Sequence, residues 1–270
     1  MSSPAAATEA DQAVAGALTA SDPDAKCAAV AALETGALAA VLASASNAPL
    51  QLLPGRPARL RLVAPRDVPQ RGLGSAAGRA ALLHAVAHIE FNAINLALDA
   101  CCRFRGLPAA YYADWLGVAQ DEARHFMLLR TRLRELGHDY GDFPAHNGLW
   151  EAAEKTAADP LLRMALVPRV LEARGLDVTP GMIRRLREAG DEATVSILQV
   201  ILDEEVAHVR IGTHWFRHLC AQRGLEPVGT FRRLLAEHGM QLRPPFNVAA
   251  RTAAGFSVDE YDARNATSGS

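Results

Sequence analysis

Two copies of the pattern Glu-x-x-His constrain what this sequence can fold into more than any other feature. Glu122 and His125 form the first copy, and Glu205 and His208 form the second. Residues three apart share one face of a helix, so each pair should project from a single helical face. Apolar residues recur at helical spacing around both pairs, which predicts that they point into a helical core.

A lone glutamate precedes each pair at nearly the same distance. Glu90 lies 32 positions before Glu122, and Glu172 lies 33 positions before Glu205. Apolar residues also flank both lone glutamates at helical spacing. Each half of the sequence therefore contributes one lone glutamate and one Glu-x-x-His pair, and the two halves are near-copies in spacing.

Six inward polar side chains of this kind require a cationic partner. An ionised carboxylate inside an apolar bundle costs several kcal/mol unless it is neutralised. Two divalent ions would satisfy all six groups, as in di-iron and di-manganese carboxylate bundles. Oxygen-rich sites with one nitrogen per metal suit iron or manganese. The sequence predicts two iron ions, with manganese as the alternative, bound by Glu90, Glu122, His125, Glu172, Glu205 and His208.

A structural interpretation competes with the metal site. A single Glu-x-x-His on a helix is more often a surface pair than a ligand pair. In a purely structural bundle, arginines would neutralise the inward acids, and Arg124 and Arg169 are the obvious choices. Two arginines cannot easily satisfy four carboxylates and two imidazoles, so the doubled pattern favours the metal.

The helical spacing predicts an all-α fold. Only residues 60–63 resemble a strand, whereas residues 24–43 favour a helix and residues 54–69 an extended connector. The main body should contain helices over residues 75–105, 109–136, 159–175, 179–189 and 191–223. Pro168 should kink the third of these helices.

The connections between these helices predict a four-helix bundle made of two antiparallel hairpins. The first two helices are joined by a short turn, whereas residues 138–158 form a longer crossover. We expect an N-terminal helical extension and connector over 1–74, the bundle over 75–223, and a C-terminal helix and tail over 224–270.

The second long helix carries a recognisable motif. Residues 121–125 read D-E-A-R-H, which resembles the D-E-x-R-H signature of the ferritin-like di-iron oxygenases. The resemblance implies that Asp121 orients His208, that Glu204 orients His125, and that Arg124 neutralises part of the acidic surroundings. Residues 204–208 depart from the signature, because they read E-E-V-A-H and lack the arginine.

Residues 84–99, together with 244–246 and 253–256, resemble an uncharacterised bacterial ferritin-like family. Its nearest functional relatives are the tRNA-hydroxylating di-iron monooxygenases. The resemblance spans residues 54–261 and implies a ferritin-like four-helix bundle with O2 as co-substrate.

His88 belongs near the predicted site without being one of its ligands. It lies two residues from Glu90 and therefore points about 160° away from it on a helix. We expect His88 either to contact the metal ligands and hold them in position or to be a hydrogen-bonded core histidine.

A reduced di-iron centre binds and activates O2. The expected function is an O2-dependent oxidase or hydroxylase acting on a small molecule or a modified nucleoside, with a redox partner supplying electrons. A ferroxidase or iron-handling protein without an organic substrate is the alternative.

Composition bounds the partners and the location. The net charge of −2 argues against non-specific nucleic-acid binding. The basic cluster of Arg184, Arg185 and Arg187 could receive an acidic redox partner or an RNA phosphate, but a solvated face is the favoured interpretation. The four cysteines form no C-x-x-C pair and indicate reduced thiols. No signal sequence or membrane span is evident, so we expect a cytoplasmic protein, and both a monomer and a homodimer stay open.

Overall fold

The computed structural model describes residues 4–45, 48–69 and 72–261. Within these ranges the regular structure is helical and no strand forms, which confirms the predicted all-α class. The chain divides into two compact units, Met1–Glu151 and Ala152–Ser270, and each is described by itself.

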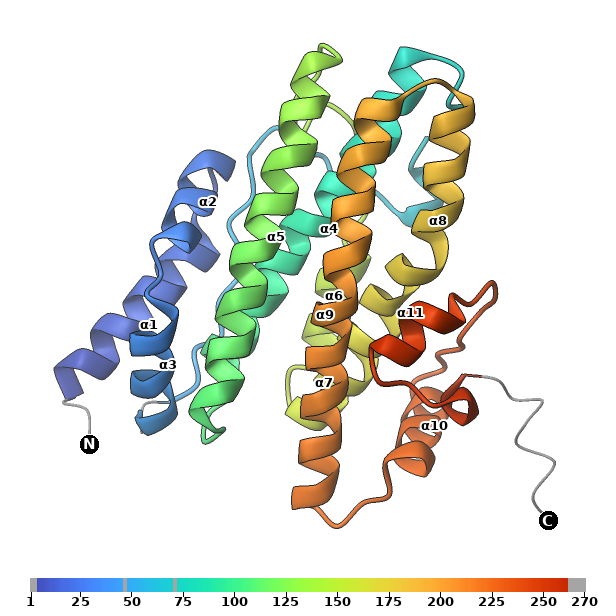
Figure 1. Cartoon of the computed structure of the whole chain (residues 1–270). Coiled ribbons are helices and arrows are strands. Elements are labelled where there is room, and N and C mark those ends of the chain that lie inside the picture. The colour runs from blue at the N-terminus through green and yellow to red at the C-terminus, as the bar shows by residue number, and fades with distance from the viewer. Residues whose placement is uncertain (1–3, 46–47, 70–71, 262–270) are drawn as a thin grey trace, which may run out of the picture. The chain divides into compact units, whose positions relative to one another are not determined.

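The first unit is organised around the helical hairpin of α4 (Ala76–Arg103) and α5 (Ala109–Glu135), which pack side by side (Figure 1). The side chain of Ser75 caps the start of α4 by accepting a hydrogen bond from the backbone N–H of Gly78. Gly106 turns the chain between the two helices with a φ of 73°, which favours glycine. Both helices begin and end within two residues of the predicted limits.

Three shorter helices pack on this hairpin. Helix α1 (Pro4–Thr19) contacts α4, and helices α2 (Pro23–Ala31) and α3 (Thr35–Ser44) contact α5. The prediction of one helix over residues 24–43 was wrong, because α2 and α3 are separated by a break and differ in direction by 83°. Lys26 explains part of this arrangement, since its buried ammonium donates hydrogen bonds to the carbonyl oxygens of Ala17 and Leu18 at the end of α1.

The connector and the crossover segment meet without forming a sheet. Residues 60–63, which resemble a strand in sequence, form none, and the only regular element in the connector over 54–69 is the short 3-10 helix Pro65–Asp67. One isolated parallel bridge joins Leu62 to Ala145. Helix α6 (Gly148–Lys155) follows in the crossover, as the single short helix expected there.

Helix α4 is long and apolar enough to cross a membrane by length and composition alone. In its most apolar window, however, 78% of the residues are buried inside the protein. A helix buried in a protein core can have the same length and composition, so these two properties are weak evidence for a membrane span.

The second unit contains one long, irregular helical run that packs against helix α9 (Glu192–Gln222). The run consists of α7 (Pro160–Leu166), the π-helix η2 (Val167–Glu172) and α8 (Ala173–Glu188). Asp159 and Asp191 cap the starts of α7 and α9, at the positions where the sequence predicts these helices to begin. Pro168 falls in η2, so the backbone adapts to the proline by a π-helical turn.

The break predicted between residues 175 and 179 is wrong, because α8 runs through this segment and through Pro180. A proline has no N–H to donate to the carbonyl oxygen four residues earlier, which here belongs to Leu176. The side-chain amide of Asn247 donates to that oxygen instead, at 3.2 Å. A distant residue therefore satisfies the carbonyl group that the proline leaves without its helical partner.

The C-terminal segment of the second unit packs on these helices. It comprises α10 (Pro227–Glu237), α11 (Val248–Ala253) and a 3-10 turn, Val258–Glu260. Glu260 forms a fully buried ion pair with Arg169 of η2. The guanidinium of Arg169 also lies 4.1–4.5 Å from the ring centroids of Phe216, Phe231 and Phe256.

Candidate metal centre

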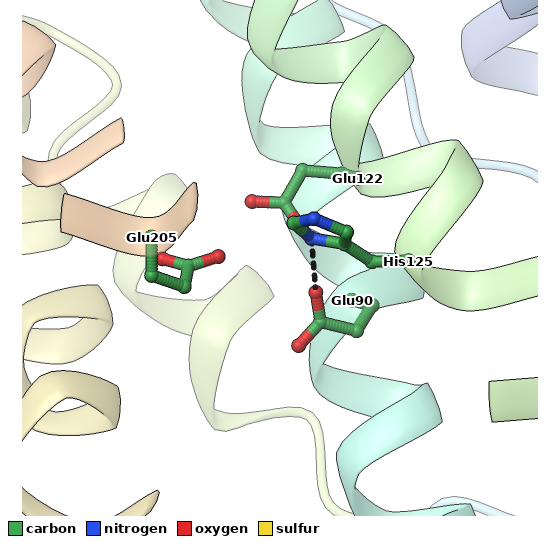
Figure 2. Close-up of side chains that lie close together, drawn as sticks. All are labelled: Glu90, Glu122, His125 and Glu205. Atoms are coloured by element: carbon green, nitrogen blue, oxygen red, sulfur yellow. Dashed lines mark ion pairs between the residues drawn. The ribbon is translucent and has the colours of Figure 1, made fainter. Parts of the chain in front are cut away.

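The first unit brings one lone glutamate and one Glu-x-x-His pair together. Glu90 projects from the middle of α4, and Glu122 and His125 project from α5 (Figure 2). The Nδ1 atom of His125 lies 3.3 Å from a carboxylate oxygen of Glu90 and 3.5 Å from one of Glu122. All three residues are at least 96% buried. Their ligand atoms lie within 4.8 Å of one another, which is close enough for one ion to contact all three.

Burial and negative charge shape the electrostatics of this cluster. Burial, and after it the neighbouring carboxylate of Glu122, raise the pKa of Glu90 to about 8. Burial alone would lower the pKa of His125, but hydrogen bonds to Glu122 and Glu90 outweigh it and raise the pKa to about 10. Both pKa shifts arise because two carboxyl groups are buried side by side with little solvation. A nearby positive charge would stabilise them, and either a protonated imidazole or a metal ion can supply it.

The second unit carries the other Glu-x-x-His pair on α9. The Nδ1 atom of His208 lies 3.3 Å from a carboxylate oxygen of Glu205. His208 is 2% exposed, and the Glu205 side chain is 13% exposed. Glu172, the remaining predicted ligand, is the last residue of η2. Short π-helical segments inside α-helices occur frequently at functional sites, because they redirect one side chain.

Two contacts hold η2 in place. The Cβ atom of any residue larger than glycine at position 212 would lie 2.3 Å from Cβ of Pro168, so α9 approaches η2 with no room for a side chain. On another side, Arg169 is fixed by its ion pair with Glu260. Neither contact was predicted from the sequence. A glycine inside a long apolar helix is a weak signal for close packing, whereas nothing local marks Glu260 as the partner of Arg169.

The two arginines considered as neutralising partners both have other acids beside them. Arg169 pairs with Glu260, and Arg124 pairs with Asp121 at 3.0 Å, where both side chains are nearly half exposed. Glu204 lies partly exposed on α9, next to Glu205. The orienting roles of Asp121, Glu204 and Arg124 toward the metal ligands stay predictions.

His88 is a hydrogen-bonded core histidine. Its Nε2 donates to the carbonyl oxygen of His146 at 3.0 Å, and its Nδ1 accepts from the hydroxyl of Tyr140 at 2.8 Å. Burial lowers the pKa of His88 to about 4, so the ring is neutral. His88 therefore fastens the crossover segment to α4, on a different side of the helix from Glu90.

The fold and these clusters define an all-α protein with buried carboxylate–histidine pairs, a donor set suited to metal ions. The chain belongs to the family described as "Protein of unknown function (DUF455)", whose model matches residues 19–262. It is 49% identical over 214 residues to a Haemophilus influenzae protein described as an uncharacterized protein, covering 76% of this chain and 74% of the relative. No solved structure matches the chain significantly.

Proposed function

We propose that this chain is a ferritin-like di-iron carboxylate protein that uses O2 to oxidise or hydroxylate a substrate. The buried cluster of Glu90, Glu122 and His125 carries the proposal, because two acids and an imidazole converge there from two helices. The matched spacing of Glu172, Glu205 and His208 supplies a second, equivalent half.

The donor set fits two ions of iron, or an iron–manganese pair. Four carboxylates and two imidazoles provide mostly oxygen ligands with one nitrogen for each ion. The raised pKa values of Glu90 and His125 mean that cation binding would displace protons from this cluster, so metal affinity should increase with pH. Bound in this site, iron would supply the binding and reduction of O2.

The protein would position the ions and keep water away from them. The buried ligands of α4 and α5 lie on helices whose neighbouring core side chains include Phe91, Phe126 and Leu129, all at most 1% exposed. Such an apolar lining keeps the reacting volume dry. We propose a small molecule or a modified nucleoside as the substrate, a redox partner as the electron source, and the cytoplasm as the location, in line with four buried free thiols.

Anaerobic loading with Fe(II), followed by metal analysis, tests the proposal. The six ligands imply about two irons per chain. Replacing Glu122 by Ala should reduce the iron content to about one or less, and the optical change on adding O2 should be lost with it. Glu135→Ala is the matched control, because Glu135 lies on the same helix in an exposed ion pair with Arg132.

Wild-type protein that binds less than about one iron per chain would refute the metal site, as would an iron content that Glu122→Ala leaves unchanged. A large hollow assembly that accumulates oxidised iron would instead identify an iron-storage protein and contradict the oxygenase.

A further inference from the structure

The second unit contains an open pocket of about 660 Å³ between α8 and the chain that precedes α11. Residues of α8, among them Pro180, Met182, Arg184 and Arg185, form one wall. Pro245, Phe246 and Asn247 form the opposite wall. The volume lies within the range of small-molecule sites, and the lining combines apolar side chains with a few polar groups, as such sites do.

The wall formed by residues 245–247 is held rigidly against α8. The buried carboxylate of Asp177 accepts hydrogen bonds from the backbone N–H of Asn247 at 2.9 Å and from the guanidinium of Arg251 at 2.7 and 3.0 Å. The amide of Asn247 donates to Leu176, and Arg174 donates to the carbonyl oxygen of Pro245 at 3.3 Å. The pocket is therefore preformed, and binding would not have to order this wall.

Phe246 is placed by the same network. The guanidinium of Arg251 lies 5.2 Å from its ring centroid, and the ring of Tyr261 lies 5.3 Å away, in a tilted arrangement. Phe246 is partly exposed and lines the pocket. A flat apolar group of a ligand could stack on it.

The pocket carries positive charge that no acid within residues 4–45, 48–69 and 72–261 neutralises. Arg184 and Arg185 are exposed, and neither forms an ion pair with any residue that the structure describes. The charge of Asp177, the acid of the lining, is balanced by the buried Arg251.

We propose that this pocket binds a small organic phosphate, with the phosphate on Arg184 and Arg185 and an apolar ring on Phe246. A phosphate monoester carries a charge of about −1.5 to −2 at neutral pH, which matches the two free guanidinium groups. Guanidinium groups bind phosphate oxygens through paired, planar hydrogen bonds, and a phosphate monoester carries more negative charge than a carboxylate. The sequence alone favoured a solvated basic face here, and the preformed wall opposite the arginines distinguishes the two interpretations. The proposal is independent of the metal.

Calorimetric titration of the full-length protein with phenyl phosphate, inorganic phosphate and benzoate tests the inference. Phenyl phosphate should bind about tenfold or more tightly than either other probe, since only it has both the phosphate and the ring. The double replacement Arg184→Gln and Arg185→Gln should weaken phenyl phosphate binding about tenfold or more. Both side chains are exposed, so the fold should be retained, which circular dichroism checks.

Arg187→Gln is the matched control. Arg187 lies on the same helix, outside the pocket lining, and pairs with Glu192 at 3.6 Å. It should leave the affinity for phenyl phosphate unchanged. No binding of phenyl phosphate, equal affinity for benzoate, or the same weakening in Arg187→Gln as in the double variant would each overturn the proposal. Iron-free and iron-loaded protein should bind phenyl phosphate equally, so a failure of the metal site leaves this test intact.

Discussion

Replacing Gly212 by Ala tests how tightly α9 packs against the π-helix η2. The added Cβ would lie 2.3 Å from Cβ and 2.5 Å from Cγ of Pro168. Carbon atoms in contact prefer a separation of about 3.5–4 Å, so α9 or η2 would have to move by more than about 1 Å. A proline ring cannot rotate out of the way, and overpacking of this kind costs about 1–3 kcal/mol.

Helix propensity acts in the opposite direction. Alanine favours a helix interior by about 1 kcal/mol over glycine, which reduces the net loss at position 212. Gly175→Ala isolates this term, because Gly175 lies inside α8 and its added Cβ would meet no atom within 4 Å. We expect Gly212→Ala to be less stable than Gly175→Ala by about 1–3 kcal/mol, and less stable than the wild type by up to about 2 kcal/mol.

Urea unfolding followed by circular dichroism measures both differences, provided that the slope of the transition stays unchanged. Because η2 ends at Glu172, Gly212→Ala should also lower the iron content after anaerobic loading, whereas Gly175→Ala should not. Equal stability of the two variants would show that α9 and η2 are not in close contact at Gly212 and Pro168.

Two further predictions concern buried charge. Glu260→Gln leaves the buried guanidinium of Arg169 without its carboxylate and should lower the free energy of unfolding, measured by urea titration, by about 3–5 kcal/mol. The control Glu237→Gln removes an exposed ion pair and should change the free energy of unfolding by less than about 1 kcal/mol. Burial lowers the pKa of His84 to about 4, so the unfolded chain takes up a proton near pH 6.5 that the folded protein does not, and stability is lost as the pH falls from about 6.5 to 4. Comparing urea titrations at pH 7 and 4.5, His84→Gln should lose less stability than the wild type, by up to roughly 3 kcal/mol; equal losses would contradict the assignment. In His84→Gln, the side-chain oxygen of the glutamine can still accept the hydrogen bond that the backbone N–H of Gly141 donates to the ring of His84 in the wild type.

Local signals predicted the long helices well. Ser75, Asp159 and Asp191 each mark a helix start, and each side chain accepts a hydrogen bond from the first turn of its helix. Capping acts over a few residues, so it can be read directly from the chain. The contact of Glu122 with His125 follows in the same way from helical spacing.

The wrong predictions depended on contacts between residues that are far apart in the chain. A new helix was predicted to begin at residue 179, just before Pro180, because no local feature shows that Asn247 satisfies the carbonyl group of Leu176. The break between α2 and α3 follows from packing against α5, which composition does not reveal. Helical propensity is a weak preference that such tertiary contacts override.

In the candidate site, too, the contacts that follow from local spacing were predicted and those between distant residues were not. The spacing of Glu90 before Glu122 suggested that both face one core, and their meeting at His125 follows from the α4–α5 hairpin. The supports of Glu172 could not be predicted, since Arg169 and Glu260 are 91 residues apart.

The 91 residues between Arg169 and Glu260 affect the order in which parts of the protein fold during synthesis. Domains generally fold from the N-terminus as the chain is synthesised, and the contacts of the first unit are complete once residue 151 has emerged. The guanidinium of Arg169 emerges long before its carboxylate, so the aromatic pocket around it cannot close until almost the whole chain has left the ribosome. Nascent chains that end before Glu260 should therefore remain sensitive to protease in residues 160–222, while the α4–α5 hairpin is already protected.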